Sequence, residues 1–238
     1  MTVENTIQPQ LVVERRFRGP ERSGNGGYTS GLLAGALGTV VTTVTLRRPP
    51  PLETPLDVRP DGGGAWLLHG DALVATAAPG ELTRPAPEPV PYDVAVNATE
   101  SYGGFVKHPF PGCYTCGPDR DVGDGLRIFP GPVREDGVAA PWVPTEVSRP
   151  TVWAALDCPG GWSFDLTGRP MVLGRMTAAI TAVPAVGEEC VVVGHAHGLD
   201  GRKGQTSSAL YGSDGALLAR AEQVWIAVDP EAINALGR

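Results

Sequence analysis

The chain has 238 residues, of which 42% are hydrophobic, and a formal net charge of −7 at pH 7. A chain of this length and composition can bury a substantial core in one or two domains. Its acidic balance, with no dense cluster of lysine and arginine, argues against a nucleic-acid-binding surface, which would carry a basic patch.

The sequence carries no signal for insertion into a membrane or for export. No stretch approaches the roughly 20 apolar residues that cross a bilayer, and residues 1–5 are polar and acidic, unlike a signal peptide. Four cysteines in a chain of this length do not form a disulfide framework. We therefore expect a cytoplasmic protein with reduced thiols, and neither a membrane nor nucleic acid among its partners.

The first half predicts a strand, a helix and then a meander of strands. Residues 11–17 have strand character, and residues 18–25 form a loop. The helix expected over residues 28–37 is rich in Gly, Ala and Leu, which suits a helix packed closely on every side. The strands expected after it are residues 40–46, 56–59, 64–69 and 73–77, separated by Gly and Asp turns.

A linker is expected over residues 79–91, where the composition shifts to Pro, Glu and Ala. We therefore divide the chain into an N-terminal half, residues 1–95, and a C-terminal half, residues 96–238. A short helix is expected over residues 95–100, close to that boundary.

The second half predicts a similar order of elements. A strand is expected at residues 138–143, and residues 151–157 lead into a helix that begins at Trp162. The high content of Gly and Pro, 32 and 24 residues, fits many turns and strands and few helices. Four strands are expected to follow the second helix, at residues 172–180, 189–197, 205–211 and 217–226.

A Gly-Gly pair stands at the start of each expected helix, in Gly26-Gly27-Tyr28 and in Gly160-Gly161-Trp162. Two further similarities follow in the same order: residues 50–56 align with residues 184–190, and residues 71–77 resemble residues 214–220. This order indicates two copies of one domain. The first amides of a helix have no partner inside it, and glycine lets a ligand approach the backbone. We therefore expect ligand binding by Gly26, Gly27, Tyr28, Gly160, Gly161 and Trp162.

These features resemble the hotdog fold of acyl-CoA thioesterases and related dehydratases, in which a curved antiparallel sheet wraps one long helix. Residues 113–118, Cys-Tyr-Thr-Cys-Gly-Pro, with a later Gly-Leu at 125–126, look like the segment that opens many single-domain thioesterases of this superfamily. The resemblance implies an α+β double hotdog, with two curved antiparallel sheets that each wrap a central helix. The chain departs from the family where Asn25 and Pro159 replace a His that many members carry before the Gly-Gly pair.

The resemblance implies a thioesterase-like hydrolase of a small-molecule acyl thioester, with coenzyme A as part of the substrate and no cofactor. Helix amides would polarise the carbonyl, and a carboxylate would activate water. Asp157 is preferred to Asp165 for this role because we expect it outside the second helix; an N-cap carboxylate is the alternative for it. Asn25 would bond a carbonyl or a water, or be a turn residue before glycine. Sites in the superfamily lie where two units meet, so Asn25 and Asp157 would each face strands of the other half.

The motif Cys113-x-x-Cys116, with His108 nearby, raises the question of zinc. A structural zinc site needs four ligands, and only one closely spaced Cys pair is present. We therefore expect no metal and instead a tight turn with small buried thiols. Cys158 is expected to be a packing residue rather than a nucleophile, because no His lies within a few residues of it.

Three pairs of basic side chains have both a functional and a plain interpretation. His195 and His197 lie on one face of an expected strand, as a metal pair, a proton shuttle or a solvent-facing strand end. Arg47 with Arg48, and Arg202 with Lys203, could meet the phosphates of coenzyme A or be solvated surface.

Two other functions fit the same residues. A hydratase or dehydratase of an acyl thioester would use a His/Asp pair, which the sequence does not reveal. A non-catalytic acyl-CoA-binding module would explain the missing His, and stabilisation by coenzyme A esters without turnover would distinguish it. A homodimer is compatible with the sequence.

Overall fold

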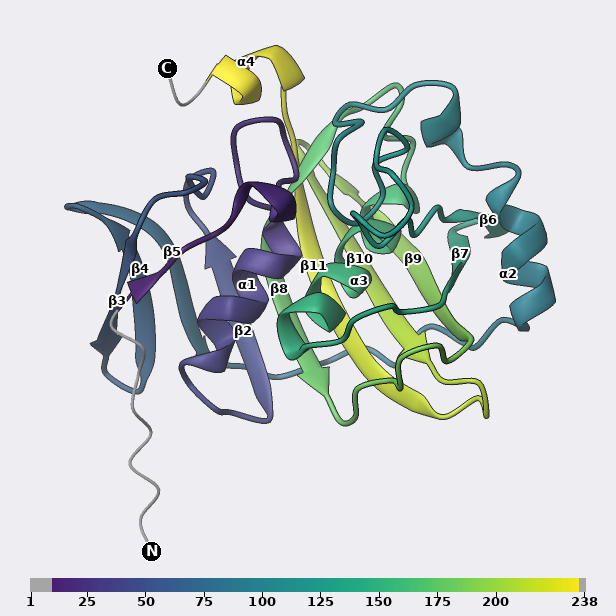
Figure 1. Cartoon of the computed structure of the whole chain (residues 1–238), viewed down its shortest axis with the longest axis horizontal. Helices are drawn as coiled ribbons and strands as arrows, with labels where there is room; N and C mark the ends of the chain where they lie inside the picture. The colour runs from purple at the N-terminus through teal and green to yellow at the C-terminus, as the bar shows by residue number, and fades with distance from the viewer. Residues whose placement is uncertain (1–9, 236–238) are drawn as a thin grey trace, which may run out of the picture.

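Within residues 10–235, the part of the chain that the computed structural model describes, 11 strands form one antiparallel sheet (Figure 1). The strands are β1 (Gln10–Leu11), β2 (Val41–Leu46), β3 (Leu56–Asp61), β4 (Gly64–His69), β5 (Ala72–Pro79), β6 (Gly131–Arg134), β7 (Gly137–Trp142), β8 (Met171–Ile180), β9 (Cys190–Asp200), β10 (Lys203–Tyr211) and β11 (Leu217–Ala227). Their order across the sheet is β1-β3-β4-β5-β2-β8-β11-β10-β9-β7-β6. The two sheets expected from the sequence are thus joined into one.

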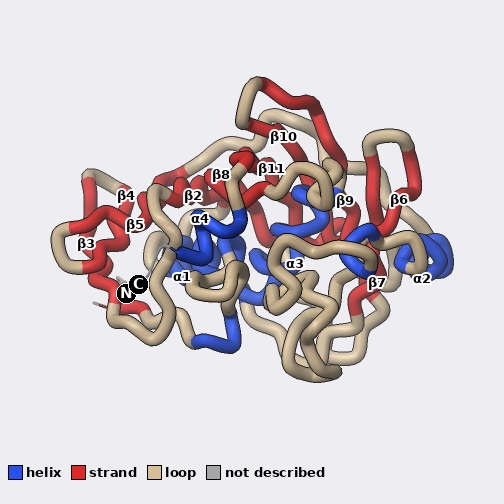
Figure 2. Tube along the Cα trace, turned by 90° about the horizontal axis from the view of Figure 1, so that it is seen from above, coloured by secondary structure: helices blue, strands red, loops and turns tan. Residues whose placement is uncertain are grey.

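The sheet is curved, and the two central helices lie on its concave side (Figure 2). These are α1 (Gly26–Gly35) and α3 (Arg149–Trp162). The other helical segments are α2 (Tyr92–Thr99), α4 (Pro230–Ala235) and the 3₁₀ turns Arg15–Phe17 and Gly103–Phe105. Helix α3 is buried on nearly all sides, from Thr151 to Trp162, and many of its positions accordingly carry small residues.

The same order of elements occurs twice in the chain. A helix is followed by four strands, β2 to β5 in the first half and β8 to β11 in the second. The strands β2 and β8 pair with each other at the centre of the sheet, where the hydroxyls of Thr43 and Thr177 are 2.8 Å apart. From this centre the strand order runs outward in the same way on both sides.

The prediction of a helix that begins after Gly160-Gly161 is wrong. Helix α3 begins at Arg149, after the N-cap Ser148, and these glycines lie in its last turn. A Cβ at Gly160 would come within 2.8 Å of side-chain oxygens on β10 and β11, and one at Gly161 within 2.7 Å of the Trp225 ring. The glycines are therefore required where α3 touches the sheet, and their amides have partners within the helix. Asp157, expected outside the helix, lies inside it.

Most other expected elements are confirmed, with boundaries shifted by a few residues. The helix expected over 28–37 is α1, the short helix over 95–100 is α2, and the four strands after the second helix are β8 to β11. The strand expected at 11–17 is wrong for most of its length, because only Gln10–Leu11 pairs with β3 before the chain turns into a 3₁₀ helix.

The Pro-rich linker has no regular secondary structure and crosses the second half of the sheet. The Glu222 carboxylate accepts hydrogen bonds from the amides of Thr83 and Arg84, both at 2.6 Å, and the Tyr211 hydroxyl donates to the carbonyl of Pro87. The boundary expected between residues 95 and 96 falls inside α2, and the division into two units stays a prediction.

No helix within residues 10–235 is both long and apolar enough to span a bilayer. The polar segment 1–5, on which the expectation of no signal peptide depends, lies outside the described residues. All four cysteines are free thiols, as expected.

Helices α1 and α3 pack with their backbones close together, because glycines of α1 face α3. A Cβ at Gly27 would lie 2.6 Å from the Trp153 carbonyl oxygen, and one at Gly31 would lie 2.6 Å from Pro150 Cα. Gly35, by contrast, is exposed at the end of α1, with no atom within 4 Å of its hypothetical Cβ. The close contact between the two halves thus requires that Gly27 and Gly31 have no side chain.

We predict that Gly31→Ala lowers the free energy of unfolding by about 1–3 kcal/mol, because the added methyl meets backbone that cannot move aside cheaply. The same substitution at Gly35 is the matched control and should be neutral or stabilise by up to about 1 kcal/mol. Urea denaturation of both variants measures the difference. Equal stabilities of the two variants would contradict this account of the helix contact.

Candidate functional site

A cavity of about 260 Å³ lies between the two halves of the chain. The first half contributes Ser23, Gly24, Asn25, Gly26, Arg47 and Arg48 to its lining. The second half contributes His108, Cys113, Cys116, Asp157, Cys158 and Trp162. Apolar side chains from β2, β8 and β11, such as Leu46, Leu173 and Ile226, complete the wall. The cavity therefore joins an apolar wall to a group of polar and sulfur-containing side chains.

Asp157 is the acidic residue of this lining, and it is 2% exposed. Its Oδ2 accepts a hydrogen bond of 2.9 Å from the Gly27 amide, in the first turn of α1. Its Oδ1 is buried and has no hydrogen-bond partner among the described residues. Burial raises the pKa of Asp157 to about 7, although the Gly27 amide and the Asn25 side chain both oppose that shift. The Gly27 amide thus fixes one carboxylate oxygen, and the second forms no direct hydrogen bond within the described residues.

Asn25 is the N-cap of α1 and connects that helix to the second half. Its Oδ1 accepts a hydrogen bond of 2.8 Å from the Tyr28 amide, as expected of an N-cap. Its Nδ2 donates to Thr115 Oγ1 at 3.4 Å and to Cys113 Sγ at 3.7 Å. Asn25 and Asp157 each face the other half, as expected, but the expected contact with strands is wrong. Asn25 meets the loop around Cys113, and Asp157 meets helix α1.

Three thiols meet beside Asp157. The sulfurs of Cys113, Cys116 and Cys158 all lie within 4.8 Å of one another, and the Cys113 and Cys158 sulfurs are 3.8 Å apart. Hydrogen bonds from Cys116 and Cys158 lower the pKa of Cys113, whereas burial raises that of Cys116 and the contact with Cys113 raises that of Cys158. The sequence could not show this cluster, because Cys158 comes from α3 and the other two come from a distant loop.

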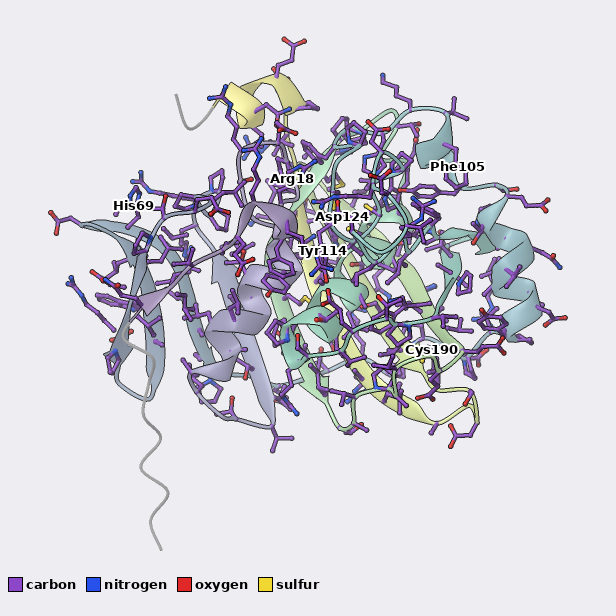
Figure 3. All side chains as sticks on the ribbon, in the orientation of Figure 1. Arg18, His69, Phe105, Tyr114, Asp124 and Cys190 are labelled. Carbon is purple, nitrogen blue, oxygen red and sulfur yellow. The ribbon has the colours of Figure 1, made fainter. Side chains whose placement is uncertain are left out.

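The six residues expected to bind a ligand divide into two groups. Gly26 and Trp162 line the cavity. The remaining four, Gly27, Tyr28, Gly160 and Gly161, are not part of its lining. Tyr28 stacks on Phe17 with ring centroids 3.8 Å apart, and both rings pack edge-to-face with Tyr114, which lies beside the upper part of α1 in Figure 3.

Two indole groups lie in the lining of the cavity, those of Trp162 and Trp225. The Trp162 side chain interacts with the Cys116 thiol and opposes the rise in its pKa that burial causes. The Nε1 atom of Trp225 is buried and has no hydrogen-bond partner within the described part of the chain. Buried polar atoms usually have partners, so Trp225 Nε1 is a donor that a polar ligand group or a water can satisfy.

A buried polar network lies beneath α3, outside the cavity. Gln223 Nε2 donates to the Leu156 carbonyl at 2.9 Å and to Ser208 Oγ at 2.7 Å, and Gln223 Oε1 accepts from Thr206 Oγ1 at 2.8 Å. Thr206, on β10, thus holds Gln223, which in turn binds the helix carbonyl. Sequence reasoning missed Gln223, although it alternates with the apolar residues Ala221 and Trp225 on one face of β11.

The three basic pairs have different surroundings, and Arg202 and Lys203 do not line the cavity. The rings of His195 and His197 share one face of β9, with centroids 4.9 Å apart, and neither lines the cavity. Arg47 and Arg48 follow β2 at the rim of the cavity, and both are exposed. Neither arginine forms an ion pair with a carboxylate in the described residues, so both are available to an anionic ligand.

No model of a known protein family and no curated protein matches the sequence. The fold, however, is similar to solved structures along nearly their whole length. A hot dog fold protein of unknown function from Alicyclobacillus acidocaldarius is 13% identical, with a TM-score of 0.60 and 93% of both chains covered. The tesB protein of Mycobacterium avium subspecies paratuberculosis is 11% identical, with a TM-score of 0.59 and coverage of 88% of this chain and 89% of that one.

A third solved structure, the acyl-CoA thioesterase II TesB2 of Mycobacterium marinum, is 10% identical, with a TM-score of 0.57 and coverage of 94% of this chain and 93% of that one. These similarities show that the chain has the hotdog fold. The resemblance noted in the sequence is confirmed at that level.

We predict that Asn25→Ala lowers the free energy of unfolding by about 1–2 kcal/mol, because the Tyr28 amide loses its partner and Thr115 Oγ1 loses one of its two hydrogen bonds. Asn97→Ala, an identical substitution at an exposed position inside α2, is the control and should change stability by no more than about 0.5 kcal/mol. Thermal or urea unfolding followed by circular dichroism measures both. Asn25→Ala with wild-type stability would contradict the capping role.

Proposed function

We propose that the protein is a double hotdog that hydrolyses acyl-CoA thioesters in the cavity between its two halves. The observation that carries the proposal is the buried Asp157, with one oxygen on the Gly27 amide and the other unpaired at an apolar cavity. The repeated order of a helix and four strands supports the double hotdog. The names of the similar structures, which include an acyl-CoA thioesterase, support the reaction class.

In the proposed reaction, Asp157 acts as the general base. Its Oδ1 accepts a proton from a water molecule as the water oxygen forms a bond to the thioester carbonyl carbon. The C–S bond then breaks, the proton passes to the leaving thiolate, and a carboxylic acid and coenzyme A are released. The Gly27 amide holds Oδ2 throughout, so the carboxylate keeps one orientation.

The carbonyl oxygen would be held at the start of α1. Gly26 is the first residue of that helix and lines the cavity, so its amide has no partner inside the helix. The unpaired indole group of Trp225, which also lines the cavity, offers a further donor. Donors fixed in place before the reaction stabilise the negative charge that develops on the carbonyl oxygen. Only one of the two Gly-Gly pairs expected from the sequence has this role in the proposal.

The substrate would enter with its acyl end toward the apolar wall. A volume of about 260 Å³ is close to the lower end of the roughly 300–1,000 Å³ typical of small-molecule sites, so it can hold only the thioester end of coenzyme A. The nucleotide would remain outside, where the exposed Arg47 and Arg48 can bind its phosphates.

The alternative of a hydratase or dehydratase has weaker support. His108 lines the cavity, as such an enzyme would require. Both of its ring nitrogens are occupied, however, because Nδ1 accepts from the Phe110 amide at 2.9 Å and Nε2 lies 3.3 Å from Cys116 Sγ. A histidine held in this way cannot exchange a proton with substrate without first breaking one of these contacts.

We predict that Asp157→Asn lowers kcat for acyl-CoA hydrolysis by about 10²–10⁴-fold, the usual contribution of a positioned general base. Asp165→Asn is the matched control, because Asp165 is exposed and bonds only within its own loop, to Thr167 and Gly168. Its activity should equal that of the wild type. A thiol-release assay over a panel of acyl-CoA chain lengths provides the measurement.

Two results would contradict the proposal. Full activity in Asp157→Asn would show that Asp157 is not the general base. Stabilisation of the wild type by coenzyme A esters, without turnover of any ester, would identify a binding module instead.

We predict that replacing both Arg47 and Arg48 with Ala raises KM for acyl-CoA roughly 5- to 30-fold, because each exposed charged contact contributes at most about 1 kcal/mol. The same variant should hydrolyse an N-acetylcysteamine thioester, which lacks phosphates, like the wild type. Arg134→Ala, on β6 at the far edge of the sheet, is the control for loss of positive charge. An equal loss on both substrates would show that the arginines support the fold rather than the phosphates.

A further inference from the structure

We propose that Cys113, Cys116 and Cys158 bind one Zn²⁺ ion through their thiolates, with a fourth coordination position that faces the cavity. The expectation of no metal depended on a single Cys pair, and the fold adds a third thiol to that pair. The proposed site is independent of the proposed hydrolysis, since its argument uses only the positions of the sulfurs and of the groups around them.

The distances between the sulfurs suit a tetrahedral zinc ion. Two sulfurs bound at about 2.3 Å and at the tetrahedral angle lie about 3.8 Å apart. The Cys113 and Cys158 sulfurs are separated by 3.8 Å, and Cys116 completes a group whose members are all within 4.8 Å. All three thiols are at least nine-tenths buried, at 5%, 2% and 6% exposure, so they converge on one point inside the protein.

Two rigid elements hold the sulfurs in place. The Cys-Tyr-Thr-Cys turn is closed by a hydrogen bond of 2.9 Å from the Gly117 amide to the Cys113 carbonyl. Gly117 leaves no room for a side chain, because a Cβ there would lie 2.4 Å from the Pro111 carbonyl oxygen. Cys158 belongs to the buried helix α3. The thiols therefore need little movement to bind an ion, which lowers the entropy cost of binding.

Two N–H groups from outside the cluster point at its sulfurs. Because His108 Nδ1 accepts a hydrogen bond from the Phe110 amide, the ring proton of the neutral imidazole lies on Nε2, which is 3.3 Å from Cys116 Sγ. Asn25 Nδ2 donates to Cys113 Sγ at 3.7 Å. Three thiolates and Zn²⁺ carry net negative charge, and hydrogen bonds to the sulfurs offset it. His108 is accordingly a hydrogen-bond donor to the Cys116 thiolate, not the fourth ligand of the zinc ion.

The fourth position belongs to the cavity. All three cysteines line it, and a zinc ion with three protein ligands keeps one position for water or a ligand atom. The chemistry of that position favours a soft or neutral donor, such as a thiol or a water molecule, because three thiolates already reduce the charge of the ion.

Metal analysis of the purified full chain tests the proposal. Wild-type protein grown with zinc should contain one zinc per chain by plasma mass spectrometry, and Cys113→Ser and Cys158→Ser should each contain less than about a tenth of that amount. Cys190→Ser is the matched control and should keep its zinc, since Cys190 is also buried but lies on β9, well apart from Tyr114 in Figure 3. His108→Ala should weaken zinc binding about 10–100-fold, as loss of a hydrogen bond to a ligand does.

A spectroscopic measurement on the wild type does not depend on whether a variant folds. Metal-free wild type titrated with Co²⁺ should develop thiolate-to-cobalt charge-transfer bands and the intense visible bands of a tetrahedral ion, and saturate at one equivalent. Addition of free coenzyme A should then shift the visible bands if its thiol takes the fourth position. Circular dichroism of each serine variant reports whether it is folded.

Three results would overturn the proposal: zinc that remains in Cys113→Ser, metal-free wild type that gives no tetrahedral cobalt spectrum, or a Cys113–Cys158 disulfide, detected by mass spectrometry, in protein that binds no metal. None of these readouts requires turnover. A protein that binds zinc and hydrolyses no thioester would therefore contradict the proposed function and leave the zinc site intact.

Discussion

The contact between α1 and α3 is the constraint on which the site depends. Glycines at two positions of α1 let the helix backbones approach closely, and this approach places the Gly27 amide 2.9 Å from Asp157. A carboxylate at a helix N-terminus gains about 0.3–1 kcal/mol at exposed positions and up to about 2 kcal/mol when partly buried. That gain offsets part of the cost of burying a charged carboxylate.

The two helices pack in opposite directions, and this makes the cavity asymmetric. Gly27 lies against Trp153 and Asp157, whereas Gly31 lies against Pro150, near the start of α3. The N-terminus of α1 therefore faces the last turns of α3, while the N-terminus of α3 is capped by Ser148 at the other end of the contact. The first half supplies backbone donors to the cavity, and the second half supplies the carboxylate and the thiols.

A helix buried on nearly all sides must fit the space between its neighbours, and its buried polar groups need hydrogen-bond partners. In α3 the close fit is provided by Gly160 and Gly161, which touch β10 and β11. A hydrogen-bond partner is provided by Gln223, whose amide donates to the Leu156 carbonyl from the sheet side. The position of Asp157 and Cys158 is set by these neighbours, since both residues lie in the same turns of the helix. Packing that has no part in the chemistry thus determines where the reactive groups lie.

The sequence by itself determined the local elements. Alternating and β-branched segments gave β2 to β5 and β8 to β11, because side-chain periodicity is a local property of a strand. It also identified Asp157, Asn25 and Gly26 as residues of interest. The start of α3 was misjudged, because Gly and Pro break exposed helices but are tolerated where a helix must touch a sheet closely.

Only the tertiary structure decided which groups meet. Cys158 joins the turn of Cys113 and Cys116 across 45 residues, and Gly27 meets Asp157 across 130. Neither distance is encoded in local spacing. Both follow from the curvature of one continuous sheet around two antiparallel helices. This arrangement brings the N-terminus of α1 against the last turns of α3.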